Sequence, residues 1–110
     1  MAYDEELADR IRGVVEDEPG LMEKRMFGGL AFLIDGNMAV GASSTGGLML
    51  RIDPADTERL VDPPHARPFE MRGKPMNGWL RIDKEATATD EELRRWIDVG
   101  VTYARTLPPK

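Results

Sequence analysis

The chain has 110 residues, of which 41% are hydrophobic and 32% are charged, and its formal net charge is -5. This length suits one domain with a single hydrophobic core, and the composition excludes an intrinsically disordered chain. No apolar run approaches the roughly 20 residues of a membrane-spanning helix, and the acidic N-terminal residues differ from the basic start of a secretory signal. The absence of cysteine excludes disulfides and thiolate metal sites. We therefore expect one cytoplasmic domain over residues 1–110, with no membrane partner.

The charges are unevenly distributed along the sequence. Residues 1–23 carry eight acids and two bases, whereas residues 24–82 carry eight bases and six acids. A nucleic-acid-binding domain usually concentrates many bases on one face. Because the middle of this chain is only weakly basic, we do not expect direct DNA binding.

The first elements follow from hydrophobic periodicity and turn residues. Within residues 4–17, apolar side chains recur at i, i+4, i+7 and i+8 from Leu7, which predicts a helix with one buried face. Residues 26–34 are apolar on both faces and predict a central strand whose two glycines bend its start or allow close backbone approach.

Asp35-Gly36 is a preferred pair for a two-residue turn, so residues 37–42 should return as a second strand. An unbroken register would place Ala39 and Gly41 opposite Phe32 and Leu30. The third strand, residues 48–52, alternates between inward leucine or isoleucine and the outward residues Met49 and Arg51.

The later elements are marked by caps and prolines. Asp53-Pro54 predicts a short helix start, and Thr89 with Glu92 predicts the capping box of a long final helix. Between them the sequence predicts an edge strand interrupted by a proline, a turn-rich loop and a last strand: residues 65–71, 72–78 and 79–82.

This order predicts an α+β domain of two layers, α-β(3)-α-β(2)-α, with a mainly antiparallel sheet. One sheet face would pack against helices and the other would be partly free. The alternation places Met49, Arg51, Trp79 and Arg81 on that free face, where arginine and tryptophan could form a cation-π patch.

Residues suited to catalysis are scarce. His65 is the single histidine and is predicted to be an exposed loop residue, which leaves no hydrolytic triad and no zinc ligand set. The glycine pairs open strands rather than helices, so we expect no phosphate-binding loop. We therefore expect no enzyme, no catalytic residues, no cofactor and no metal.

Four segments resemble the N-terminal domain of the TfoX family. They are residues 24–38 with Met26-Phe27-Gly28-Gly29, residues 48–53, Gly73-Lys74-Pro75-Met76, and residues 79–82. The resemblance extends from about residue 5 to residue 106. It implies a fold like that of type III secretion chaperones. It also implies a regulator of natural competence that acts with a cyclic-AMP-responsive transcription factor. Those regulators carry a second, helical domain, so we expect this chain to be a stand-alone N-terminal domain.

These observations together predict a small non-enzymatic module that regulates transcription or competence by binding a protein partner, for which a transcription factor is the class expected. A partly free sheet face would also favour a homodimer. The predicted interaction surface consists of Arg25, Phe27, Gly28, Gly29, Met49, Arg51, Lys74, Pro75, Met76, Trp79 and Arg81. The alternative is a domain that binds a small anionic ligand, or acts on it, through convergence of Arg25, Arg51, Lys74 and Arg81.

Overall fold

The computed structural model describes residues 4–26, 28–44, 46–61, 65–71 and 73–109. Its elements are α1 (Glu5–Val15), β1 (Leu21–Met26), β2 (Gly29–Ile34), β3 (Asn37–Ala42), β4 (Leu48–Arg51), η1 (Pro54–Asp56), α2 (Thr57–Leu60), β5 (Ala66–Met71), β6 (Lys74–Ile82), η2 (Lys84–Thr87) and α3 (Asp90–Thr106). The strands form one antiparallel sheet in the order β1-β2-β3-β4-β6-β5. The α+β class is confirmed.

The helices begin where the sequence places their caps. The Asp4 carboxylate accepts a hydrogen bond from the Leu7 amide at the start of α1. At the start of α3, the Thr89 hydroxyl accepts from the Glu92 amide and the Glu92 carboxylate accepts from the Thr89 amide. Both caps satisfy amides that a helix end would otherwise leave unpaired, so the predicted capping box is confirmed.

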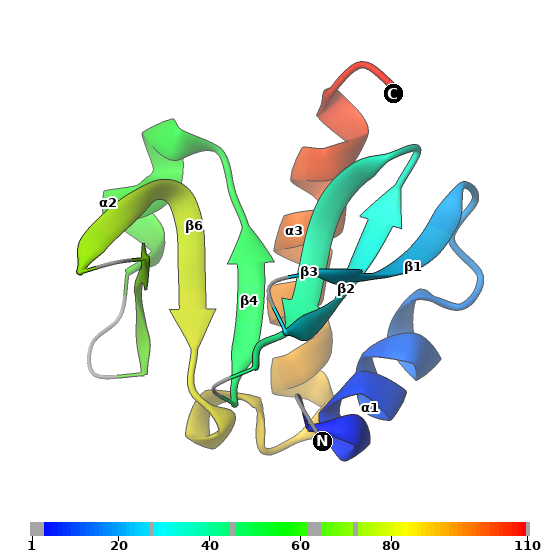
Figure 1. Cartoon of the computed structure of the whole chain (residues 1–110), viewed down its shortest axis with the longest axis horizontal. Coiled ribbons are helices and arrows are strands. Elements are labelled where there is room, and N and C mark those ends of the chain that lie inside the picture. The colour runs from blue at the N-terminus through cyan, green and yellow to red at the C-terminus, as the bar shows by residue number, and fades with distance from the viewer. Residues whose placement is uncertain (1–3, 27, 45, 62–64, 72, 110) are drawn as a thin grey trace.

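One face of the sheet packs against α1 and α3; in Figure 1, α3 runs behind β3 and α1 lies below β1 and β2. We call the buried cluster between them the helix-side core. Its largest fully buried side chains are Ile11, Val15, Phe32, Ile34, Val40, Leu48, Leu50, Ile52, Leu80, Ile82, Leu93 and Ile97. The inward direction predicted for Leu48, Leu50 and Ile52 is confirmed.

Gly100 brings α3 unusually close to the sheet. A Cβ atom at this position would lie 2.4 Å from the carbonyl oxygen of Ala39 and 2.7 Å from Leu50 Cδ1. Only a residue without a side chain fits between the helix and β3 at this distance, so Gly100 sets the separation of the two layers.

The structure has one strand more than the sequence predicts before α2. β1 forms an antiparallel hairpin with β2, and its middle residues Glu23, Lys24 and Arg25 are exposed. An edge strand with charged residues on both faces shows no hydrophobic alternation, and it exists here because β2 supplies its hydrogen bonds. Met26, predicted to open the central strand, instead ends β1.

The predicted Asp35-Gly36 turn is confirmed, but the register after it is wrong. Both residues have positive φ, as a type I′ turn requires, and Ile34 lies opposite Asn37. A bulge then intervenes, so that Phe32 lies opposite Val40 and Leu30 opposite Ala42. The extra residue shifts the pairing by one position and bends the strand.

The edge strand with Pro68 is confirmed as β5, which carries a second irregularity between Pro68 and Glu70. The loop predicted over residues 72–78 is wrong in its extent, because β6 begins at Lys74. Its first residues pair with the end of β5, Lys74 with Met71 and Pro75 with Glu70. A proline is tolerated there because Pro75 sits near the hairpin end.

The sheet face away from the helices is free only in part, as predicted: Met22 and Arg67 are exposed there, but the centre of the face is buried. Ala31, Leu33, Met38 and Met49 are buried there, and Met26, Phe69 and Trp79 pack against them. Every one of these residues belongs to a strand, and we call them the strand-side cluster. Among the residues that the structure describes, strand side chains alone bury this cluster.

Candidate interaction surface

Four of the predicted interaction residues lie together on the strand side of the sheet. Met49 pairs with Arg81, and Arg51 pairs with Trp79 on the neighbouring strand. Residues directly opposite one another in an antiparallel pair project from the same face, about 5 Å apart. The alternation therefore predicted their common face correctly.

The predicted cation-π contact is present and involves a third residue. The Arg51 guanidinium carbon lies 5.3 Å from the centre of the Trp79 ring and 5.8 Å from the centre of the Tyr103 ring. Both distances fall within the range of attraction between a cation and an aromatic face. Tyr103 comes from α3, 52 positions after Arg51 in the sequence, and no local pattern indicates that the two meet.

Asp83 anchors the charged side chains at the other end of β6. Its Oδ1 lies 3.3 Å from Arg67 Nη2 and 3.4 Å from Arg81 Nε. Partial burial raises the pKa of Asp83, but the charge of Arg67 and the polar contacts with His65, Arg81 and Arg67 outweigh it, so the pKa lies below its ordinary value. Asp83 therefore stays ionised and holds both guanidinium groups at the end of the sheet.

A cavity of about 420 Å³ opens beside these two arginines. Its lining comes from the β3–β4 loop, β5 and β6, and consists of Ser43, Ser44, Arg67, Pro68, Phe69, Glu70 and Arg81. Hydroxyl and guanidinium donors thus share one concavity with an aromatic ring. Such a mixture suits a ligand, or a partner side chain, that has both an acidic and an apolar part.

The other predicted cations do not join Arg81 in this cavity. Arg25 pairs with Leu30, a member of the helix-side core, and therefore projects from the opposite face of the sheet. Arg51 contacts Trp79 and Tyr103, while Lys74 is exposed beside the β5–β6 turn. The predicted convergence of four cations is thus not found, and Arg67 accompanies Arg81 instead.

The paired glycines after Met26 have a steric role. Gly28 has a φ of +77°, and a Cβ atom on Gly29 would lie 2.3 Å from the carbonyl oxygen of Ala42. This confirms the predicted bend and close approach. Phe27 lies outside the described residues, as do the side chains of Pro75 and Met76, whose backbones belong to β6.

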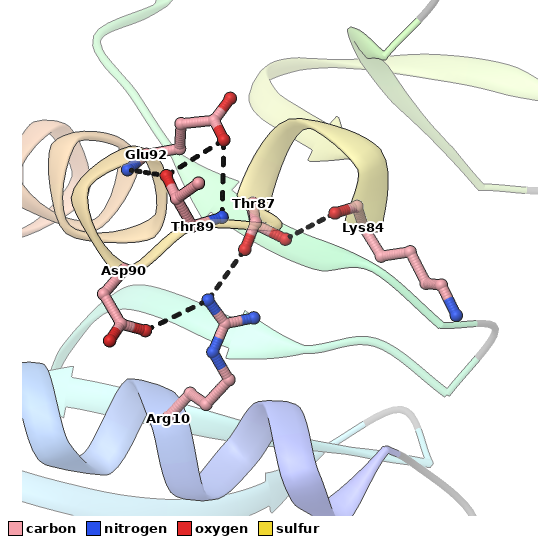
Figure 2. Close-up of polar contacts among 6 residues, drawn as sticks. All are labelled: Arg10, Lys84, Thr87, Thr89, Asp90 and Glu92. Atoms are coloured by element: carbon pink, nitrogen blue, oxygen red, sulfur yellow. Dashed lines mark hydrogen bonds and ion pairs between the residues drawn. The ribbon is translucent and has the colours of Figure 1, made fainter.

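A second polar cluster joins the two long helices. Figure 2 shows Arg10 of α1 donating through Nη2 to the Thr87 carbonyl oxygen at 2.8 Å and to Asp90 Oδ1 at 3.3 Å. The Thr87 hydroxyl donates to the Lys84 carbonyl oxygen, and Thr89 and Glu92 form the capping box beside it. These bonds tie α1 to the start of α3, so this cluster supports the fold.

The apolar surface available for a homodimer interface is smaller than the sequence suggests. Among the described residues, Met22 is the one large hydrophobic side chain that is exposed, and it lies on the edge strand β1. Of the two apolar residues predicted on the partly free face, Met49 is buried and Trp79 is half-buried.

Donor atoms close enough for a metal ion occur in one group of the described residues, namely His65, Asp83 and Glu85. His65 is half-buried rather than exposed. The sequence gives no sign of this group, because its members are separated by as many as 20 positions.

None of the helices in the described part of the chain has both the length and the apolar composition needed to cross a membrane. Residues 15–104 match the family model of the TfoX N-terminal domain. No curated protein matches the chain.

Proposed function

Since the chain belongs to the TfoX N-terminal domain family, we propose that it is a non-enzymatic regulatory module that binds a protein partner in the cytoplasm. The resemblance stated above implies regulators of competence that work with a transcription factor. A transcription factor is accordingly the class of partner proposed here.

One observation carries this proposal, namely the grouping of Arg51, Trp79 and Arg81 on one sheet face beside the cavity of Arg67 and Phe69. Tryptophan and arginine are over-represented among the residues that dominate binding energy at protein interfaces. The chain is acidic overall, yet this face presents three guanidinium groups. An acidic segment of the partner would complement them.

The test compares two variants in cells. Crosslinking followed by mass spectrometry should recover the same transcription factor with the wild-type chain and with Arg94→Glu, a charge reversal on an exposed position of α3. The combined variant Arg51→Glu, Trp79→Ala, Arg81→Glu should lose that partner while its circular dichroism spectrum stays unchanged. Recovery of the same partner by the combined variant would contradict the proposed surface.

Direct DNA binding provides a second test. With a net charge of -5 the isolated chain should give no mobility shift of duplex DNA even at low salt. A shift that weakens steeply with added salt would instead indicate a chain that contacts promoters itself.

The cavity supports a second candidate function, binding of a small anionic ligand through Arg67, Arg81 and the two serines. Inorganic phosphate and citrate are suitable probes because both are multiply charged and compact. In ¹H–¹⁵N spectra, either probe should shift the amide signals of Ser44 and Arg67 but not those of Gly13 in α1. Unchanged spectra at millimolar probe would leave the protein-binding proposal as the better one.

A further inference from the structure

His65, Asp83 and Glu85 are brought together by the backbone of the sheet. His65 lies directly before β5, Asp83 directly follows β6, and Glu85 belongs to η2. The Asp83 amide donates to the His65 carbonyl oxygen at 2.8 Å, which extends the β5–β6 pairing one step beyond Ala66 and Ile82. This hydrogen bond fixes the backbones of His65 and Asp83 relative to each other at the end of the sheet.

The distances within this group are too long for good hydrogen bonds and suit a shared ion. His65 Nδ1 lies 3.5 Å from Asp83 Oδ2 and 3.8 Å from Glu85 Oε2. N–H···O hydrogen bonds measure about 2.7–3.2 Å between heavy atoms. Two ligands that each lie about 2.1 Å from a tetrahedral zinc ion are separated by about 3.4 Å. All three donor atoms lie within 4.8 Å of one another.

His65 Nδ1 is also an unexplained buried atom. Its solvent-accessible area is below 1 Å², and it has no hydrogen-bond partner among the described residues. A buried polar atom without a partner costs free energy, so such atoms usually signal a missing ligand, ion or water. Here the nitrogen faces two carboxylates.

The Asp83 carboxylate is already oriented for coordination. Its Oδ1 is held by Arg67 and Arg81, which leaves Oδ2 directed at His65. Metal-binding carboxylates are commonly fixed in this way through their second oxygen. The two arginines also balance the charges of Asp83 and Glu85, so the affinity should be moderate rather than that of a buried structural site.

We propose that this group binds one divalent transition-metal ion of the zinc class through His65 Nδ1, Asp83 Oδ2 and Glu85 Oε2. A water molecule occupies the fourth tetrahedral position. The imidazole selects zinc, cobalt, nickel or copper over calcium and magnesium, which prefer oxygen ligands in larger number. The metal site does not require the partner-binding function proposed above, although Asp83 also holds two arginines beside that surface.

The experiment uses the whole chain, freed of any histidine tag and of metal, because His65 is its single histidine. Calorimetric titration with Zn²⁺ should give one ion per chain, and Co²⁺ should produce the visible absorption of a tetrahedral site. The single imidazole signal in ¹⁵N spectra should move on zinc addition and return with EDTA.

Two substitutions remove ligands without removing the ion pairs of Asp83 with Arg67 and Arg81. His65→Gln should abolish the cobalt absorption, and Glu85→Gln should weaken zinc binding about tenfold or more. Glu91→Gln, at an exposed position in the first turn of α3, is the matched control and should bind as the wild type does.

Three results would overturn the proposal. They are the absence of zinc binding at millimolar concentration, binding that leaves the His65 signal in place, and equal affinity in wild type and Glu85→Gln. The first would mean that His65 serves only as an ion-pair partner of the two carboxylates.

Discussion

Both faces of the sheet contain a cluster of buried side chains, but the two clusters are covered by different means. The helix-side core is built from aliphatic residues and Phe32, and α1 and α3 cover it. The strand-side cluster contains smaller or more flexible residues, Ala31, Leu33, Met38 and Met49, and strands alone close it. Adjacent residues of one strand thus lie in two different kinds of core.

This difference shows which kind of buried face hydrophobic periodicity in the sequence can predict. A face covered by helices requires matching apolar stripes on the strands and on the helices, and each stripe is visible in the sequence. A face closed by sheet curvature depends on bulges and on edge residues that reach inward. Methionine suits such a face because its unbranched side chain fills irregular space.

The largest expected effect on stability distinguishes the two sheet faces at neighbouring residues of β4. Leu50→Ala should lower the free energy of unfolding by about 4 kcal/mol, and Met49→Ala by about 2 kcal/mol, within the range for large-to-alanine changes in cores. The neighbouring methionines can move into the space that Met49 leaves, whereas the helices fix the surroundings of Leu50. Urea denaturation of both variants measures the difference, and equal losses would mean that both faces are packed equally rigidly.

Gly100→Ala tests how closely α3 approaches the sheet. Alanine normally favours a helix over glycine by about 1 kcal/mol, but here its Cβ would meet the carbonyl oxygen of Ala39. We expect a loss of about 1–3 kcal/mol from overpacking. Gly13→Ala in α1 is the control, because no atom lies within 4 Å of the added Cβ, and it should raise the melting temperature.

The Arg51–Trp79 contact should contribute less than either core. A double-mutant cycle with Arg51→Met and Trp79→Leu should give a coupling energy of about 0.5–1 kcal/mol. Retaining Tyr103 in all four proteins keeps the second ring contact constant in the cycle. A coupling energy of zero would mean that Arg51 only shields the aromatic ring from water.

The smallest expected effect on stability concerns the ion pair between α1 and the edge strand β1. Arg12 of α1 donates from Nε and Nη2 to the two Glu23 oxygens of β1 at 2.7 and 2.8 Å. The hydrogen bond from Arg12 lowers the pKa of Glu23 and outweighs the opposing effect of burial. Because both side chains are partly exposed, Glu23→Gln should cost only about 0.2–1 kcal/mol at pH 7.

The stability contributed by the Arg12–Glu23 ion pair should depend on pH in a definite direction. A carboxyl group whose pKa is lower in the folded state contributes stability above its unfolded pKa of about 4.3, and loses it as pH falls through the folded value. The stability difference between wild type and Glu23→Gln should therefore shrink as the pH is lowered from 5 in chemical denaturation. A difference that stays constant to pH 2 would argue against the ion pair.

Local signals account for the elements that were predicted correctly. Asp4, Thr89 and Glu92 cap helices through contacts within a few residues, and Asp35-Gly36 forms its turn through its own backbone preference. β1 and the first half of β6 were not predicted because their sequences are rich in charged and turn-forming residues. These segments adopt strand conformation only because they pair with a neighbouring strand.

The residues of the interaction surface also fall into those that the sequence predicted and those that only the fold brings together. The alternation of β4 and β6 correctly placed Met49, Arg51, Trp79 and Arg81 on one face. Tyr103 contacts Arg51, and Asp83 contacts both Arg81 and Arg67. These partners lie outside β4 and β6, and no local pattern in the sequence indicates that they meet the arginines. Arg25 was expected to converge with the other cations, and its actual direction could not be predicted because β1, which determines it, was not predicted.

The residues alone therefore specify the class of fold, the family and the helix-side core, because periodicity, caps and short motifs act over a few positions. Sheet curvature, the burial of the strand-side cluster and the grouping of His65 with Asp83 and Glu85 arise only in the folded chain. These features depend on bulges and on pairing between strands that are distant in the sequence. The free energy of such pairing depends on both strands, so it cannot be inferred from either segment alone.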